Sequence, residues 1–258
     1  MLIQGNVRLC PQGIFYGITV YLFTMNDIDF ILSELESISE PDYLKKMAHF
    51  GIDISKAFGI RVPNIRKLAK QIGKNQELSL LLWETGFHEA RLLATFIGDY
   101  KQVLETQINA WTSDFSSWDM CDQACGNLFV KTPYFKPKAF EFAQAEAEFV
   151  KRTGFVLMAE AAVHLKKEPN ETFLSFLPII EREAYDNRNF VKKAINWALR
   201  QIGKRNAFLH EHAIQTANNI LAQNNKKANW VALDALRELN SDAVLARHVK
   251  RPTLNTSR

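Results

Sequence analysis

Apolar residues recur every three or four positions along most of this chain, which is the spacing of one face of an α-helix. From Asn26 onward, amphipathic segments of roughly 10 to 18 residues follow one another. Short polar breaks such as "GIRVPN", "ETGFH" and "KKEPN" separate them. The alternation of β-branched residues that is typical of strands is nearly absent after residue 24. The pattern predicts an all-α protein.

The short breaks make successive helices antiparallel neighbours, so about a dozen of them indicate a bundle or a stack of helical pairs. The segment "QIGK" closes a predicted helix at residues 71–74 and again at 201–204, which favours a stack of repeats. Gly73 and Gly203 are expected to end their helices in the left-handed backbone conformation. We therefore predict a superhelical stack with a concave surface on which a polymer can lie.

The chain divides into three predicted parts. Residues 25–245 form one helical domain, residues 1–24 form an N-terminal extension without an assigned function, and residues 246–258 form a basic tail. Met25 is an alternative start, because helical patterning begins directly after it. The extension contains "LCPQGIFYGITVYLFTM", which lacks a cleavage site and is too short to cross a membrane, so no membrane association is expected.

The stretch "NFVKKAINWALRQIGKRN", residues 189–206, predicts one helix with two contrasting faces. Its apolar stripe consists of Val191, Ile195, Ala198 and Ile202, and is assigned to the core. The opposite stripe carries Lys193, Trp197, Arg200 and Lys204. Residues 186–206 hold six basic residues and one acid, a local excess of five positive charges. An aromatic ring on such a face is suited to a nucleic-acid backbone, although Trp197 could also pack against a neighbouring helix while the cations reach solvent.

A second informative stretch is "SSWDMCDQACGNLF", residues 116–129. Helical spacing places the Asp122 carboxylate one turn from the Trp118 indole. An acid close to DNA phosphates is repelled by roughly 1 to 4 kcal/mol per close pair, so a DNA-binding protein that has one there is expected to use its charge. The alternative is an ordinary solvated acid.

Arg152 lies in "EFVKRTGFVLMAEAAVHL", a predicted helix that is apolar around much of its circumference. An arginine in such surroundings generally has a partner. A protein carboxylate and a phosphate are both compatible with the sequence.

Three cysteines without a CxxC pair indicate a reducing compartment and no disulfide framework. Cys121 and Cys125 have no histidine at ligand spacing, so no metal site is expected. Isolated histidines such as His49, His88 and His164 are predicted to pack between helices.

From about Tyr43 to Leu239 the chain resembles the AlkD-like DNA alkylation-repair family, alkylpurine glycosylases built from HEAT-like helical repeats. The segments that carry the resemblance, in family order, are "GIRVPNIRKLAK", "LLWETGFHEARLLA", "WDMCD", "FVKRTGFVLM" and "NFVKKAINWALRQIGKRN". The resemblance implies a catalytic aspartate at Asp122, active-site tryptophans at Trp118 and Trp197, and DNA-contacting arginines at Arg152 and Arg200. Lys193 and Lys204 would bind phosphates beside them.

The function implied by this resemblance is hydrolysis of the N-glycosidic bond of cationic N3- or N7-alkylated purines in double-stranded DNA. The resemblance implies a monomer. We also expect no cofactor and no metal, and a cytoplasmic protein that acts at the bacterial nucleoid. The alternative is a HEAT-like repeat scaffold that binds nucleic acid or protein and has no chemistry, because fold does not establish activity.

Overall fold

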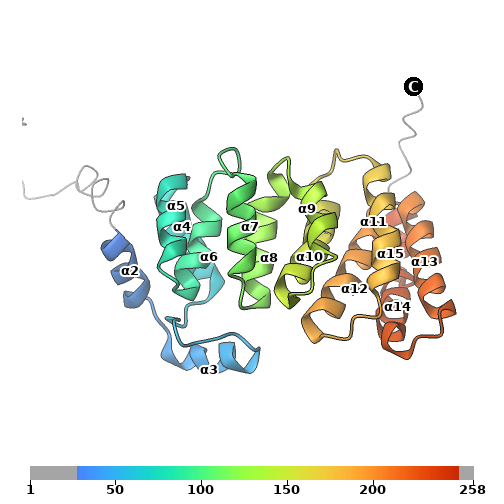
Figure 1. Cartoon of the computed structure of the whole chain (residues 1–258), viewed down its shortest axis with the longest axis horizontal. Coiled ribbons are helices and arrows are strands. Elements are labelled where there is room, and N and C mark those ends of the chain that lie inside the picture. Colours follow the sequence, from blue (N-terminus) through green and yellow to red (C-terminus); the bar gives the residue numbers. More distant parts are fainter. Residues whose placement is uncertain (1–27, 250–258) are drawn as a thin grey trace, which may run out of the picture.

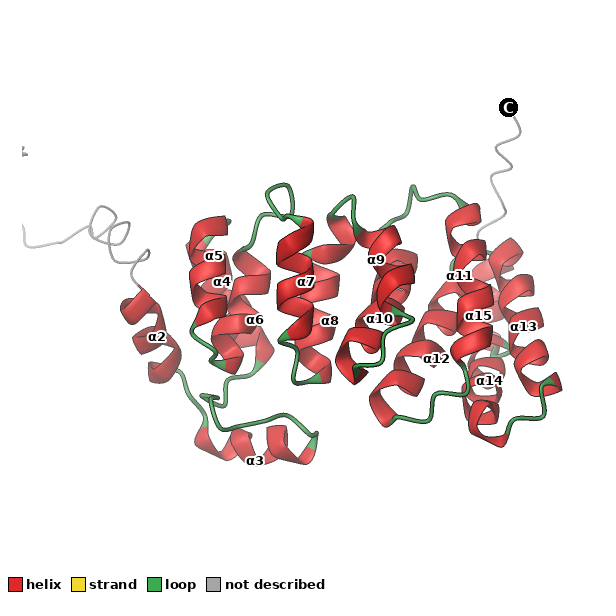
Figure 2. Cartoon of the chain, in the orientation of Figure 1, coloured by secondary structure: helices red, strands yellow, loops and turns green. Residues whose placement is uncertain are grey.

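The computed structural model describes residues 28–249, and every regular element in that range is helical (Figures 1 and 2). The elements are α2 (Ile28–Ser37), α3 (Pro41–His49), α4 (Val62–Ile72), α5 (Gln76–Glu84), α6 (His88–Ile97), α7 (Glu105–Ser113), α8 (Trp118–Asn127), η1 (Phe129–Lys131), α9 (Phe135–Phe142), α10 (Glu148–His164), α11 (Asn170–Glu183), α12 (Asn189–Gly203), α13 (Ala207–Ala222), α14 (Lys226–Leu239) and α15 (Asp242–Val249). The expected extension 1–24 and the end of the expected tail, from residue 250, lie outside the described residues. Within residues 28–249, no helix combines the length and apolar composition needed to cross a bilayer.

The helices stand side by side in two layers along the long axis of the molecule (Figure 1). We call α4, α6, α8, α10, α12 and α14 the inner layer, and α5, α7, α9, α11 and α13 the outer layer. In the inner layer, α10 packs between α8 and α12, and α12 packs against α14. Cys121 and Cys125 contact the carbonyls of Phe149 and Thr153, each 28 residues further along, so α8 and α10 run parallel. The prediction of an all-α stack of antiparallel helix pairs is confirmed.

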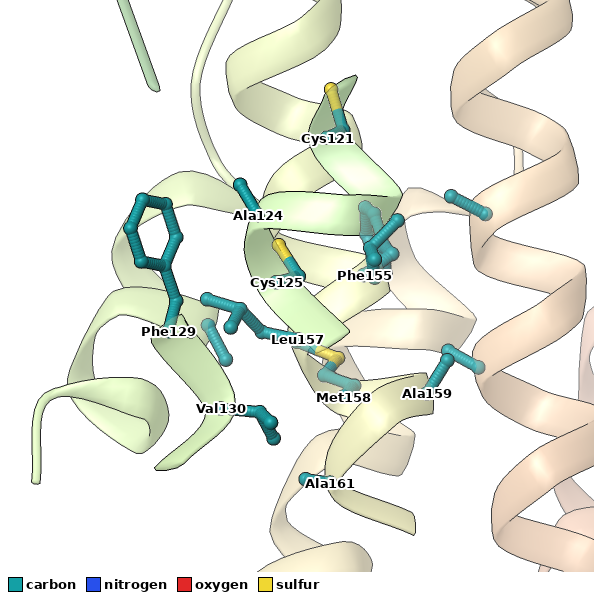
Figure 3. Close-up of a cluster of buried hydrophobic side chains, with 14 of the residues drawn as sticks. Cys121, Ala124, Cys125, Phe129, Val130, Phe155, Leu157, Met158, Ala159 and Ala161 are labelled. Carbon is teal, nitrogen blue, oxygen red and sulfur yellow. The ribbon is translucent and has the colours of Figure 1, made fainter. Parts of the chain in front are cut away.

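The core follows the predicted apolar stripes. On α12, the four residues assigned to the core have no exposed surface: Val191, Ile195, Ala198 and Ile202. Between α8 and α10, Cys121, Cys125 and Phe155 pack in one buried cluster with Phe129 (Figure 3). Half of the residues of α8 are therefore buried, and the strip that contains Trp118 and Asp122 keeps partial exposure and can reach a ligand.

The two glycines that were expected in left-handed turns differ. Gly73 follows α4 with φ of +78°, as expected. For Gly203 the expectation was wrong, because it is the last residue of α12 and has no positive φ. A Cβ there would lie 2.7 Å from Leu239 Cδ2 and 2.9 Å from Ala213 Cβ. Glycine is needed at this position because α12 approaches α13 and α14 too closely for a side chain.

Cations from outside each helix cap the C-terminal ends of three inner helices. Lys74 Nζ donates to the carbonyls of Phe96 and Gly98 at the end of α6, and Lys131 Nζ donates to Asn127 O at the end of α8. Arg205 donates to four carbonyls at and beyond the end of α10: Ala162, Leu165, Lys166 and Glu168. A positive charge is favourable at a helix C-terminus, where carbonyl dipoles accumulate.

We expect Gly154→Ala to destabilise the fold. A Cβ on Gly154 of α10 would lie 2.3 Å from Ala143 N and 2.9 Å from Ala139 O, which are backbone atoms of α9 and its C-terminus. The helices must separate, at a cost of about 1 to 3 kcal/mol in the free energy of unfolding. Urea unfolding followed by circular dichroism measures this cost. In the control Gly126→Ala, the three atoms nearest to the new methyl group belong to the Glu160 carboxylate, at 3.0 to 3.1 Å, and not to a helix backbone. An equal loss of stability in both variants would contradict the prediction.

Candidate active site

Asp122 on α8 and Arg152 on α10 form a buried ion pair between two inner helices. Arg152 Nη2 lies 2.8 Å from Asp122 Oδ1 and 3.0 Å from Oδ2, and Nε lies 3.2 Å from Oδ1. Only 5% of the surface of Arg152 is exposed. Of the two partners that the sequence left open for this arginine, the structure places the protein carboxylate beside it.

The same guanidinium reaches the third inner helix. Arg152 Nη1 donates to Phe190 O in the first turn of α12, at 2.6 Å. The four hydrogen bonds of Arg152 use at most four of its five N–H donors, which leaves one on Nη1. One side chain thus connects α8, α10 and α12 and keeps a donor for a ligand.

Two carboxyl groups on these helices that are largely shielded from solvent have raised pKa values. Burial raises the pKa of Asp122 to about 6, although the positive charge and hydrogen bonds of Arg152 act in the opposite direction. Burial, together with the negative charge of Asp122, raises the pKa of Glu160 to about 7. His164 Nε2 lies 2.9 Å from Glu160 Oε2. Such perturbed acids are typical of functional sites.

A hydrogen-bonded cluster fixes the start of α8, where Trp118 is the first residue. His88 Nε2 lies 2.9 Å from Asp119 Oδ2, and Ser117 Oγ donates to Asp119 Oδ1 at 2.7 Å. Burial lowers the pKa of His88, but the hydrogen bond and charge of Asp119 outweigh this effect and the pKa is raised. The expectation that His88 only packs between helices was therefore incomplete. His88 and Asp119 are far apart in sequence, and no local pattern indicates their contact.

Glu89, the neighbour of His88 on α6, is fully buried and holds the segment between α3 and α4. Its carboxylate accepts hydrogen bonds at 2.8 to 3.0 Å from three consecutive backbone N–H groups, those of Phe58, Gly59 and Ile60. This segment leads back to α3, which lies below the row of helices and in neither layer (Figure 1). The Trp118 indole N–H donates to Phe50 O at the end of α3, at 3.1 Å.

A cavity of about 470 Å³ lies where the end of α3 meets the N-terminal parts of α8, α10 and α12. Three of its lining residues were predicted site residues: Trp118, Arg152 and Lys193. The others are His49, Phe50, Gly51, Asn189 and Phe190. Asp122 adjoins the cavity through its ion pair with Arg152. The wall from α3 was not predicted, because it depends on a contact between residues 50 and 118.

Trp197 lies one turn beyond Lys193 on α12 and does not line this cavity. Its ring is half-buried and packs against the core, so the expectation that it points away from the core was only partly correct. With the Gln201 amide oriented so that its oxygen faces the indole, the Trp197 N–H donates to it at 3.0 Å.

Arg200 and Lys204, predicted to contact DNA, both form ion pairs with Glu238 of α14. The three side chains together carry one net positive charge, since two cations share one carboxylate. Arg200 Nε is buried without a hydrogen-bond partner. The outward basic stripe of α12 is therefore partly neutralised by its neighbouring helix, and Lys193 is its exposed member at the cavity.

Among the described residues, no group of three or more histidine, cysteine or acidic side chains is arranged to bind a metal ion. Cys121 and Cys125 are free and fully buried, and burial raises the pKa of both thiols.

The fold and the cavity define a helical-repeat protein with an acid–arginine pair between α8 and α10, two central helices of its inner layer. The sequence model of a family described as "DNA alkylation repair enzyme" matches residues 31–239, so the chain belongs to the DNA alkylation repair enzyme family. No curated protein matches the chain.

A solved structure shares the fold. Its description reads "A new family of proteins related to the HEAT-like repeat DNA glycosylases with affinity for branched DNA structures". The TM-score is 0.68 at 20% sequence identity, and the match covers 75% of this chain and 83% of that chain. This likeness establishes a HEAT-like repeat fold.

We expect the ion pair of Asp122 and Arg152 to show strong coupling. Arg152→Met leaves a buried carboxylate without its counter-charge, which typically costs about 3 to 5 kcal/mol of stability. Adding Asp122→Asn removes that charge, so the double variant should lose less stability than the sum of the two single variants. Urea unfolding of all four proteins measures the coupling energy. Additivity within about 0.5 kcal/mol would contradict the prediction.

Proposed function

We propose that the protein is a DNA glycosylase that releases cationic N3- or N7-alkylated purines from double-stranded DNA. The observation that carries this proposal is the Asp122 carboxylate on α8, which is largely shielded from solvent, paired with Arg152 and one turn from Trp118. Arg152 and Trp118 both line the aromatic cavity. Membership of the DNA alkylation repair enzyme family supports it.

The proposed reaction breaks the bond between C1′ of the deoxyribose and the purine nitrogen. The bonding electron pair leaves with the base and neutralises its positive charge, so the leaving group needs no proton. Positive charge develops on the deoxyribose, and water adds to C1′ and loses a proton, which leaves an abasic site and the free base. A fixed negative charge near C1′ stabilises this transition state, as in glycoside hydrolysis.

Each site residue has a distinct proposed role. Asp122 supplies the negative charge, and Arg152 fixes the direction of its carboxylate. Trp118 offers a ring face to the cationic sugar. Lys193 binds a phosphate at the cavity edge. Trp197, Arg200 and Lys204 contact the DNA further along α12, where the Glu238 pairing weakens the attraction of the two cations for phosphate.

A second candidate function is binding of DNA without chemistry. The solved structure with this fold is described as having affinity for branched DNA structures. The bidentate contact with Arg152 is compatible with this function, because a carboxylate that is fully engaged in an ion pair can be purely structural.

Asp122→Asn should separate the two functions. The substitution keeps the shape of the side chain and removes its charge, so base release should slow by roughly 10²- to 10³-fold while DNA affinity stays the same or rises. Single-turnover release of base from a duplex with one N7-methylguanine, at matched salt, measures this effect. Asp242→Asn, an exposed acid on α15, is the charge-matched control. If the unsubstituted protein binds the duplex and releases no base, the glycosylase proposal fails.

The rate of base release should depend on the ionisation of Asp122. Because burial raises the pKa of this carboxyl to about 6, its charged form is lost as the pH falls through that value. The single-turnover rate should therefore rise between about pH 5 and about pH 7.5 and then level off. The same profile for Asp122→Asn should be flat after subtraction of spontaneous release. A midpoint near the ordinary carboxyl pKa of about 4 would contradict this prediction.

A further inference from the structure

Glu160 on α10 is a second shielded acid beside the ion pair of Asp122 and Arg152. Its carboxylate lies against Gly126 of α8, where a Cβ atom would be 3.0 Å from Glu160 Oε1 and 3.1 Å from Oε2. Gly126 follows Asp122 by one helical turn on the partly exposed strip of α8. Only 9% of Glu160 is exposed. We call Asp122, Gly126, Arg152 and Glu160 the α8–α10 seam, which therefore holds two carboxyl groups about one helical turn apart.

The two carboxyl groups differ in their partners. Arg152 balances the charge of Asp122 and contacts both of its carboxylate oxygens. Among residues 28–249, the only ion-pair contact of Glu160 is with His164, whose Nε2 lies 2.9 Å from Glu160 Oε2. Burial, and then the charges of neighbouring lysines, lower the pKa of His164, so this imidazole is neutral above pH 7. When Glu160 is ionised, its charge therefore has no cation in direct contact to balance it.

Lys131 is a cation that acts on the Glu160 carboxyl from a longer distance. It is exposed, and its ammonium group caps α8 by donating to Asn127 O at 2.9 Å. Solvent screens an exposed charge more strongly than a shielded one, so Lys131 offsets the charge of Glu160 only in part. The α8–α10 seam therefore carries a net negative charge, and Glu160 is the residue that supplies it.

A net charge in this position matters for a cationic substrate. An N3- or N7-alkylated purine is positively charged before its bond to the sugar breaks, and the charge moves to the deoxyribose as the bond breaks. The field of the Asp122–Arg152 pair weakens quickly with distance, because its two charges are opposite. The field of the Glu160 carboxylate is not cancelled in this way and acts over a longer distance. Glu160 can therefore stabilise the positive charge both on the base and on the sugar.

We propose that Glu160 is the residue by which the site distinguishes cationic alkylated purines from neutral bases. It acts by electrostatic attraction and does not contact the breaking bond. Repulsion between Glu160 and DNA phosphates weakens the binding of all duplexes about equally, so this residue increases selectivity and not overall affinity. The inference deepens the proposed function, and it rests on that function in that the lesion must lie beside Asp122.

The inference can be tested with two uncleavable abasic-site analogues in otherwise identical duplexes. A pyrrolidine ring in place of the deoxyribose carries a positive charge, whereas a tetrahydrofuran ring is neutral. The measurement is the ratio of the two Kd values at pH 8, where Glu160 is mostly ionised, since burial raises its pKa to about 7. The unsubstituted protein should prefer the pyrrolidine duplex. Glu160→Gln should reduce this preference by roughly 5- to 30-fold, the effect of one charge several ångströms away at an intermediate dielectric constant.

Three variants separate the charge of Glu160 from its place in the structure. Glu160→Asp keeps the charge and should retain most of the preference. His164→Gln keeps a polar side chain beside Glu160 and should also retain most of it. Asp242→Asn removes an exposed acid of α15, outside the seam, and should leave the ratio unchanged. Repulsion from phosphates is the same in both duplexes and cancels in the ratio. Affinity for the tetrahydrofuran duplex should stay equal or rise in Glu160→Gln, which shows that this variant is folded.

An unchanged ratio in Glu160→Gln, or an equal fall of the ratio in Glu160→Gln and Glu160→Asp, would overturn the inference. Equal affinity of the unsubstituted protein for both duplexes would also overturn it. Release of N7-methylguanine tests the proposed function separately, because the binding measurements require no catalysis. If base is released and the ratio does not depend on Glu160, the glycosylase proposal stands and the role of Glu160 falls. If no base is released and the ratio depends on Glu160, the glycosylase proposal fails and recognition of a cation by the seam stands.

Discussion

The guanidinium of Arg152 is buried where three inner helices meet, and a charge in that position requires a matching partner. Asp122 on α8 supplies the opposite charge, and the Phe190 carbonyl on α12 supplies a further acceptor. The parallel alignment of α8, α10 and α12 is tied to this contact, because sliding any of the three would leave a buried donor or acceptor unmatched. The N-terminal parts of the three helices lie next to one another beside the ion pair, and together they form one wall of the cavity. The same interaction that stabilises the stack therefore orients the carboxylate that we propose for catalysis.

Two adjacent residues at the start of α6 determine the position of the opposite wall. His88 contacts Asp119 in the first turn of α8 and fixes the start of that helix. Glu89 accepts hydrogen bonds from the backbone of the segment that connects α3 to α4. The two connections meet again at the hydrogen bond from Trp118 to the Phe50 carbonyl. Neither residue lines the cavity, yet together they set the distance between its aromatic sides. The shape of the cavity therefore depends on buried polar contacts outside it. Loss of one partner in such a contact would leave the other partner desolvated and unpaired, which is costly.

Local sequence patterns were sufficient to predict the helices, the α12 core stripe and the proximity of Trp118 to Asp122. Each of these features follows from the helical periodicity of a single segment. The resemblance of five segments to one family added Arg152 to the same site. Local patterns could not indicate that Glu238 neutralises part of the basic stripe or that Phe50 closes the cavity, since these contacts join residues at least 34 positions apart. The error at Gly203 has the same origin. Glycine is required at this position because the side chains of Leu239 and Ala213 leave no room for a Cβ atom. A glycine at a helix end looks the same in the sequence whether a left-handed turn or close packing of another helix requires it.

The cations at the C-terminal ends of α6, α8 and α10 make the two edges of the inner layer electrostatically different. Parallel helices align their dipoles, so one edge of the layer collects unpaired amide groups and the other collects unpaired carbonyls. Lys74, Lys131 and Arg205 cover the carbonyl edge, whereas the amide edge, where the cavity opens, keeps its partial positive charge. An anionic strand that approaches the layer is therefore drawn to one end of it even where acidic and basic side chains cancel. The net charge of +4 conceals this polarity, which belongs to the backbone.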